Sequence, residues 1–68
     1  MKAFDLRGKR QHQGLRIEAV ASRAGVYDNT LRDIERGVVG IDQETYDLIE
    51  SAITGLAGEK SKREEVRA

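Results

Sequence analysis

The chain has 68 residues, with 12 basic and 12 acidic side chains, one histidine and no cysteine. This length gives one domain near the lower limit for a useful core, and the composition excludes disulfides and a Cys/His metal site as sources of stability. The longest apolar run is three residues, 19–21, which excludes a signal peptide and a membrane span, so we expect a cytoplasmic protein.

The charges are unevenly distributed, although the formal net charge is zero. Residues 1–36 carry eight basic and five acidic side chains, residues 37–59 carry five acidic and no basic ones, and residues 60–68 have an excess of two bases. Contact with phosphates requires a locally basic surface, which overall neutrality does not remove. The first half of the chain is therefore compatible with nucleic acid, with modest non-specific affinity.

The first half of the chain predicts three short helices. The first is weak and covers about 3–13, because Gly8 interrupts its apolar pattern, and Gly14 ends it. A second helix is predicted over about 17–24 and a third over about 28–36, followed by Gly37.

The second and third of these helices are joined by a turn that needs glycine. Apolar side chains share one face of the second helix, at Val20, Ala21 and Ala24. Gly25 follows where a helix needs a left-handed C-terminal residue, a conformation that only glycine adopts cheaply. The stripe for the next helix is Val26, Leu31 and Ile34. Two helices crossing at roughly 90–120° over such a turn form a helix-turn-helix, a common device for presenting a helix to DNA.

The second half predicts one longer helix and a tail. Asp42 is a good N-cap after a glycine-bracketed loop at 37–41, so a fourth helix should run over about 42–54. Leu56 and Ala57 can add a short fifth turn, and 58–68 should be a charged, flexible tail. We therefore predict an all-α, compact domain of four to five helices over 1–57, with a central helix-turn-helix.

Across about residues 4–54 this order resembles the Cro and phage-repressor class of helix-turn-helix proteins, the XRE-type family. The matching positions are Gly14-Leu15, the core and turn residues named above, Ile34-Glu35-Arg36-Gly37, and Glu44-Thr45-Tyr46. The resemblance implies a sequence-specific double-stranded DNA-binding transcriptional regulator, a repressor that binds a pseudo-palindromic operator as a homodimer through the major groove. It also implies an ion pair between Arg10 and Glu35. Arg16 and Ile17 depart from the family, which has a small polar cap followed by Gln there.

The base-reading residues are predicted on the third helix. Asp28, Asn29, Arg32 and Asp33 share the face opposite its core stripe, which is left to solvent or DNA. Asn can take adenine through N6 and N7, Arg can take guanine through O6 and N7, and Asp can accept from cytosine. Tyr27, just before the helix, can reach a phosphate or a thymine methyl. Two alternatives stay open: Asp28 can be the N-cap of this helix, and Asp33 can pair with a basic side chain.

Phosphate contacts are predicted from basic side chains and from one helix N-terminus. Arg16 can reach a phosphate directly, whereas Ile17 can contribute only its backbone N–H, as helix N-termini do for anions. The remaining candidates are Arg7, Lys9, Arg10, Arg23 and Arg36. About half of such residues are ordinarily just solvated surface.

A homodimer is predicted through Ile53 and Leu56, because too little chain follows them to cover their apolar surface. His12 has neither a second imidazole nor clustered carboxylates beside it, so no enzyme activity, metal or cofactor is expected. The alternative function is a protein-interaction module, such as an antitoxin-like or controller subunit, whose acidic fourth helix binds a basic partner protein.

Overall fold

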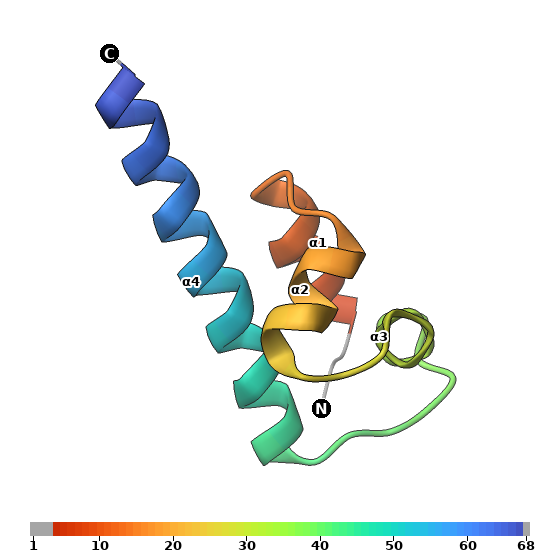
Figure 1. Ribbon diagram of the computed structural model, residues 1–68. Helices are drawn as coiled ribbons and strands as arrows, with labels where there is room; N and C mark the ends of the chain where they lie inside the picture. Colours follow the sequence, from red (N-terminus) through yellow and green to blue (C-terminus); the bar gives the residue numbers. More distant parts are fainter. Residues whose placement is uncertain (1–3, 68) are drawn as a thin grey trace.

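The computed structural model describes residues 4–67, with side chains over 5–60. Its helices are α1 (Phe4–His12), α2 (Ile17–Ala24), α3 (Asp28–Glu35) and α4 (Gln43–Arg67). Figure 1 shows the three short helices gathered beside α4, whose C-terminal part extends beyond them. The molecule is accordingly elongated, measuring 41 × 19 × 18 Å. The predicted all-α fold is confirmed, and none of the described helices is long and apolar enough to cross a membrane.

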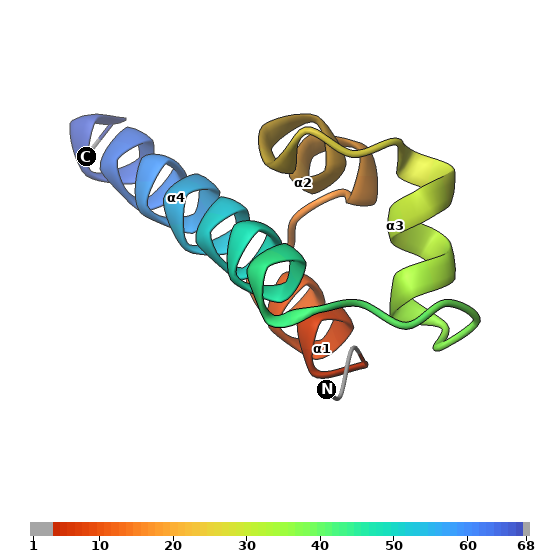
Figure 2. The same cartoon turned by 90° about the horizontal axis from the view of Figure 1, so that it is seen from below.

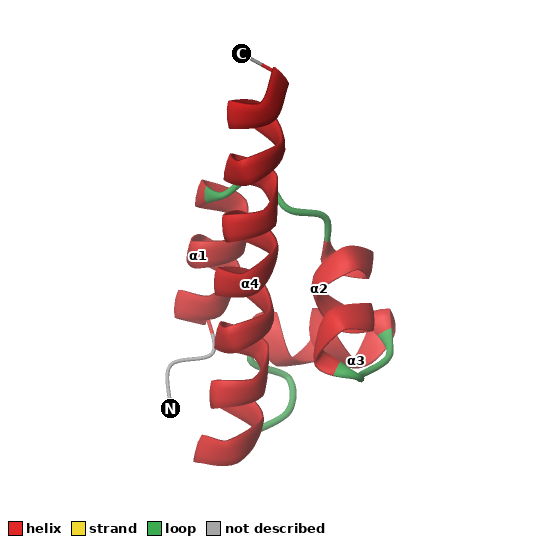
Figure 3. Ribbon diagram, turned by 60° about the vertical axis from the view of Figure 1, so that its left-hand side comes forward, coloured by secondary structure: helices red, strands yellow, loops and turns green. Residues whose placement is uncertain are grey.

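The core is formed where the apolar faces of the four helices meet. α4 packs against α1 on one side and α2 on the other (Figure 3), and α3 packs on α1 and α2. The buried apolar side chains are Leu6, Val20, Ala21, Leu31, Ile34, Ile49, Ala52 and Ile53. Each short helix contributes only one or two of them, so α2 and α3 are positioned mainly by their contacts with neighbours.

Gly25 makes the turn between α2 and α3. It adopts φ +78°, and the N–H of Val26 donates a hydrogen bond to the carbonyl oxygen of Ala21 at 2.9 Å, which closes the end of α2. α3 begins three residues later, at Asp28, and runs across the end of α2 (Figure 2). The predicted helix-turn-helix is therefore present, and the left-handed glycine sets its geometry.

The fourth helix is longer than the sequence pattern predicts. Asp42 caps it as expected, since its Oδ1 accepts the Thr45 backbone N–H at 2.9 Å. The predicted end near residue 54 is wrong, because α4 continues through Gly55 and Gly58 to Arg67, and residues 4–67 contain no separate fifth helix. The predicted flexibility of the charged segment from 58 onward stays a prediction.

Contacts with the first half of the chain account for this continuation. Glu59 forms an ion pair with Arg23 of α2, and the Lys60 ammonium donates to the carbonyl oxygen of Gln13 at 3.2 Å. A glycine inside a helix costs about 1 kcal/mol relative to alanine, and the packing of Leu56 against the core, together with these exposed polar contacts, can offset that cost. The local glycine signal is thus overridden by packing of the turn at 55–60 against α2 and the α1–α2 connection.

Candidate nucleic-acid interface

The predicted base-reading face of α3 is open to solvent. Asp28, Asn29 and Arg32 are exposed, Tyr27 is 82% exposed, and Asp33 is half-buried. The opposite face of the helix carries Leu31 and Ile34 into the core. α3 is thus held from behind by apolar contacts while its polar side is free to meet another molecule.

Asp28 is not the N-cap of α3. Tyr27 occupies that position, with an extended backbone at φ −76° and ψ 147° and no side-chain cap bond. Asp28 is the first residue of the helix itself, where a carboxylate interacts favourably with the positive end of the helix dipole. The capping alternative raised from the sequence is therefore wrong.

Asn29 and Arg32 are joined by a hydrogen bond on the exposed face. The Nη1 group of Arg32 donates to Oδ1 of Asn29 at 3.0 Å, one helical turn away. Side chains three residues apart are neighbours on a helix surface, so the spacing could have indicated this pair. The sequence-based prediction assigned Asn29 and Arg32 to separate base contacts and did not include this hydrogen bond.

An arginine-lined hollow lies between α1, the start of α2 and α3, with a volume of about 400 Å³. Its lining residues are Arg7, Arg10, Ile17, Arg32, Glu35 and Arg36. Four guanidinium groups against one carboxylate make it basic. The N-cap of α2, Arg16, makes no side-chain cap bond, so the N–H groups of the first turn of α2 keep their capacity to bind an anion. The arrangement suits a phosphate.

The Arg10–Glu35 ion pair is part of the lining of this hollow. Nε and Nη2 of Arg10 donate to the two carboxylate oxygens of Glu35 at 2.8 and 3.0 Å, and Nη1 donates to the Leu15 carbonyl oxygen at 2.9 Å. The side chains are only 13% and 3% exposed. The pairing that the family resemblance implies is confirmed, and it ties Arg10 to the fold. A phosphate contact by Arg10 stays a prediction.

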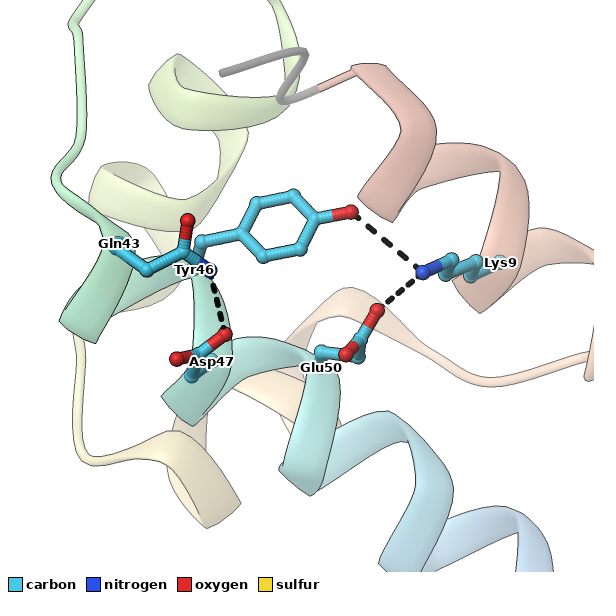
Figure 4. Close-up of polar contacts among 5 residues, drawn as sticks. All are labelled: Lys9, Gln43, Tyr46, Asp47 and Glu50. Carbon is cyan, nitrogen blue, oxygen red and sulfur yellow. Dashed lines mark hydrogen bonds and ion pairs between the residues drawn. The ribbon is translucent and has the colours of Figure 1, made fainter.

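Two other predicted phosphate contacts are paired with α4. Lys9 lies between the Tyr46 hydroxyl, at 3.5 Å, and the Glu50 carboxylate (Figure 4). Its hydrogen bond with Glu50 raises the pKa of Lys9, and that with Glu59 raises the pKa of Arg23. Neither residue lines the arginine-lined hollow. The basic side chains thus fall into two groups: Lys9 and Arg23 face α4, whereas Arg7, Arg32 and Arg36 face the hollow.

The sequence argument for the dimer surface fails at one of its two residues. Ile53 is buried, with 4% of its surface exposed, because it faces the core next to the end of α1. Leu56 is half-buried and packs against the same core. Among the described side chains of α4, the large apolar one that is exposed is Leu48, at 52%. A dimer interface at Leu56 stays a prediction.

Neither a metal site nor a similar solved structure adds to this geometry. Among the residues that the structure describes, no three His, Cys, Asp or Glu side chains form a group able to hold a metal ion. Comparison with curated proteins and with solved structures found no match. A family model for the helix-turn-helix, HTH_3, matches residues 6–54, which include the core, the Gly25 turn, α3 and the hollow. The chain therefore belongs to the XRE-type helix-turn-helix family, whose domain is a DNA-binding regulatory one.

Proposed function

We propose that this protein represses transcription by binding a specific pseudo-palindromic operator in double-stranded DNA as a homodimer. The observation that carries the proposal is the position of Arg32, which belongs both to the exposed face of α3 and to the arginine-lined hollow. Base-reading groups and phosphate-binding groups thus form one continuous surface. A helix that enters the major groove needs this arrangement, because phosphates flank the groove on both sides.

In this arrangement α3 lies in the major groove. Its N-terminal side chains, Asp28 and Asn29, face base edges, and Arg32 follows one turn later. Arg7, Arg36 and the N–H groups at the start of α2 bind the flanking backbone. Two such domains related by a twofold axis read half-sites about 34–36 Å apart, and occupancy of that site near a promoter blocks transcription.

The test compares one specific duplex with one unrelated duplex. The operator is first selected with the purified protein from a random DNA pool, and affinities are then measured by fluorescence anisotropy at fixed salt. Arg32→Ala should lose about 1–3 kcal/mol on the operator and less on the unrelated duplex. Arg36→Ala should weaken both alike and reduce the salt slope by about one.

Ser51→Ala is the matched control, since Ser51 is exposed on α4 and is not part of the hollow. It should leave both affinities unchanged. Equal losses for Arg32→Ala on the two duplexes would assign Arg32 to phosphate contact. Failure of the wild-type protein to select any sequence would refute sequence-specific binding.

Leu48 supports a second candidate, a module that binds a basic partner protein through α4. It is 52% exposed in a shallow hollow that also involves Glu44 and Asp47, so one apolar side chain is framed by negative charge. A stoichiometric partner that is captured by wild-type protein and released by Leu48→Lys would support this role. The same substitution should leave operator binding intact, because Leu48 belongs neither to α3 nor to the arginine-lined hollow.

A further inference from the structure

The bond between Asn29 and Arg32 restricts what the two side chains can read. The Oδ1 atom of Asn29 accepts from Arg32 at 3.0 Å. An asparagine that recognises adenine needs that same oxygen to accept from the adenine N6 amino group, while its Nδ2 group donates to N7. A positively charged donor already at Oδ1 competes with the N6 amino group. Oδ1 keeps a second lone pair, but the Arg32 guanidinium beside it restricts the approach of a second donor, whereas Nδ2 can donate without such competition.

We propose that Asn29 and Arg32 act as one hydrogen-bonded unit in which Asn29 orients Arg32 toward a guanine, instead of reading an adenine by itself. This inference rests on the proposed sequence-specific binding and names the base it favours. The joined pair presents mainly N–H donors to DNA, because its one acceptor atom, Oδ1, already bonds Arg32. Guanine presents two acceptors in the major groove, N7 and O6, whereas adenine presents one acceptor and one donor.

The surroundings of Arg32 favour the same orientation. Arg7 and Arg36 line the same hollow as Arg32, and their like charges oppose movement of its guanidinium deeper into that space. Asn29 supplies an uncharged acceptor on the other side. Since a free arginine loses rotamer freedom when it binds, an anchor present before DNA arrives lowers that cost. Asn29 is therefore a positioning residue for Arg32.

The experiment is selection from a random duplex pool, followed by affinity measurements on single-base variants of the selected site. Wild-type protein should select a guanine at one position of each half-site, and Arg32→Ala should lose about 5- to 150-fold discrimination there. Asn29→Ala should lose discrimination at the same base pair. The double variant should lose no more than Arg32→Ala alone, because the two residues form one unit.

Two further variants separate positioning from simple loss of a contact. Asn29→Asp should keep the guanine preference, because a carboxylate also accepts from Arg32, although phosphate repulsion lowers its overall affinity. Thr30→Ala is the matched control, since Thr30 is exposed beside Asn29, and its selected site should be that of the wild type. All four substitutions lie on an exposed surface, and circular dichroism checks that each variant is folded.

Three results would overturn the inference while sequence-specific binding stands. Asn29→Ala could relax an adenine at a different position and leave the guanine intact. The losses of the two single variants could add in the double variant. Arg32→Ala could relax no guanine. Absence of any selected sequence with wild-type protein is a distinct result, which refutes the proposed function and this inference together.

Discussion

Replacement of Arg10 by methionine should destabilise the domain far more than loss of an ordinary surface charge. The Glu35 carboxylate is only 3% exposed, and the change removes the two N–H groups that donate hydrogen bonds to it in the native fold. It also removes the donor to the Leu15 carbonyl oxygen. Breaking a buried ion pair at one partner costs on the order of 3–5 kcal/mol, because an uncompensated charge stays buried.

That cost is large compared with the stability of the domain. At about 0.05–0.15 kcal/mol per residue, a chain of this size has a free energy of unfolding of roughly 3–10 kcal/mol. Arg10→Met should therefore be partly or fully unfolded near 37 °C. Any loss of DNA binding in this variant reports unfolding first, whatever contact Arg10 makes with a phosphate.

A double-mutant cycle tests the explanation. Arg10→Met and Glu35→Leu should each be strongly destabilising, whereas the double variant should regain most of the loss, since apolar groups of similar volume replace a buried pair at little cost. Urea denaturation followed by circular dichroism at 222 nm gives the three free energies. The coupling should persist at 0.5 M salt, because buried pairs are weakly screened.

Lys9→Met is the control for an exposed pair. Lys9 contacts Glu50 at the surface, so its substitution should leave the denaturation midpoint nearly unchanged. The reasoning is refuted if Arg10→Met is as mild as Lys9→Met, or if the losses at Arg10 and Glu35 add in the double variant.

Four further outcomes follow from the fold and the interface. Gly25→Val should lower the melting temperature, because the left-handed conformation at φ +78° costs an L-residue about 1–2 kcal/mol even though no atom beyond the neighbouring residues lies within 4 Å of an added Cβ. A variant that melts like the wild type would disprove the assignment of the turn to Gly25. Hydrogen bonds from the side chain and the backbone N–H of Thr45 lower the pKa of Asp42 below its ordinary value of 3.8. The Asp42 carboxylate therefore stabilises the fold above that pH, and its contribution disappears as the pH falls through the lowered pKa. Asp42→Ala should make the free energy of unfolding fall less steeply with decreasing pH in a denaturation series between pH 2 and 6. The logarithm of operator affinity should fall with that of salt on a shallow slope, at about −0.9 per neutralised phosphate, and a slope that requires a dozen phosphates per subunit would contradict the small basic surface. Wild-type protein should sediment as a homodimer at high micromolar concentration. Leu56→Glu should sediment as a folded monomer and bind the operator much more weakly. Wild-type protein that binds its operator as a monomer would rule the dimer out.

The elements that the sequence predicts best are those governed by local chemistry. Gly25 ends α2 because its left-handed conformation is a local requirement, and the apolar stripe of α3 enters the core because helical periodicity places it there. The end of α4 could not be predicted in this way. Gly55 and Gly58 are local stop signals, and tertiary contacts override them. Leu56 packs against the core, and Glu59 and Lys60 contact residues 36 and 47 positions earlier in the chain.

The candidate site divides along the same line. The exposed face of α3 follows from periodicity, and the Asn29–Arg32 bond follows from a spacing of three residues. The partners of Lys9 and Arg23 lie in α4, 41 and 36 residues further along the chain, and no local pattern pairs them. Arg10 and Glu35 could be paired only through the family resemblance, since their separation of 25 residues carries no geometric signal.

These pairings explain how a chain of zero net charge keeps the basic surface that we propose binds DNA. The charge count along the sequence assigns every basic side chain before residue 37 to the half of the chain that contains the helix-turn-helix. In the structure, however, Glu50 and Glu59 of α4 neutralise Lys9 and Arg23. Acidic side chains of α4 therefore neutralise basic side chains of α1 and α2 that lie outside the hollow. Positive charge remains on Arg7, Arg32 and Arg36, around one hollow beside α3. A small concentrated charge of this kind favours a defined orientation on DNA over strong non-specific attraction, which the low overall charge opposes.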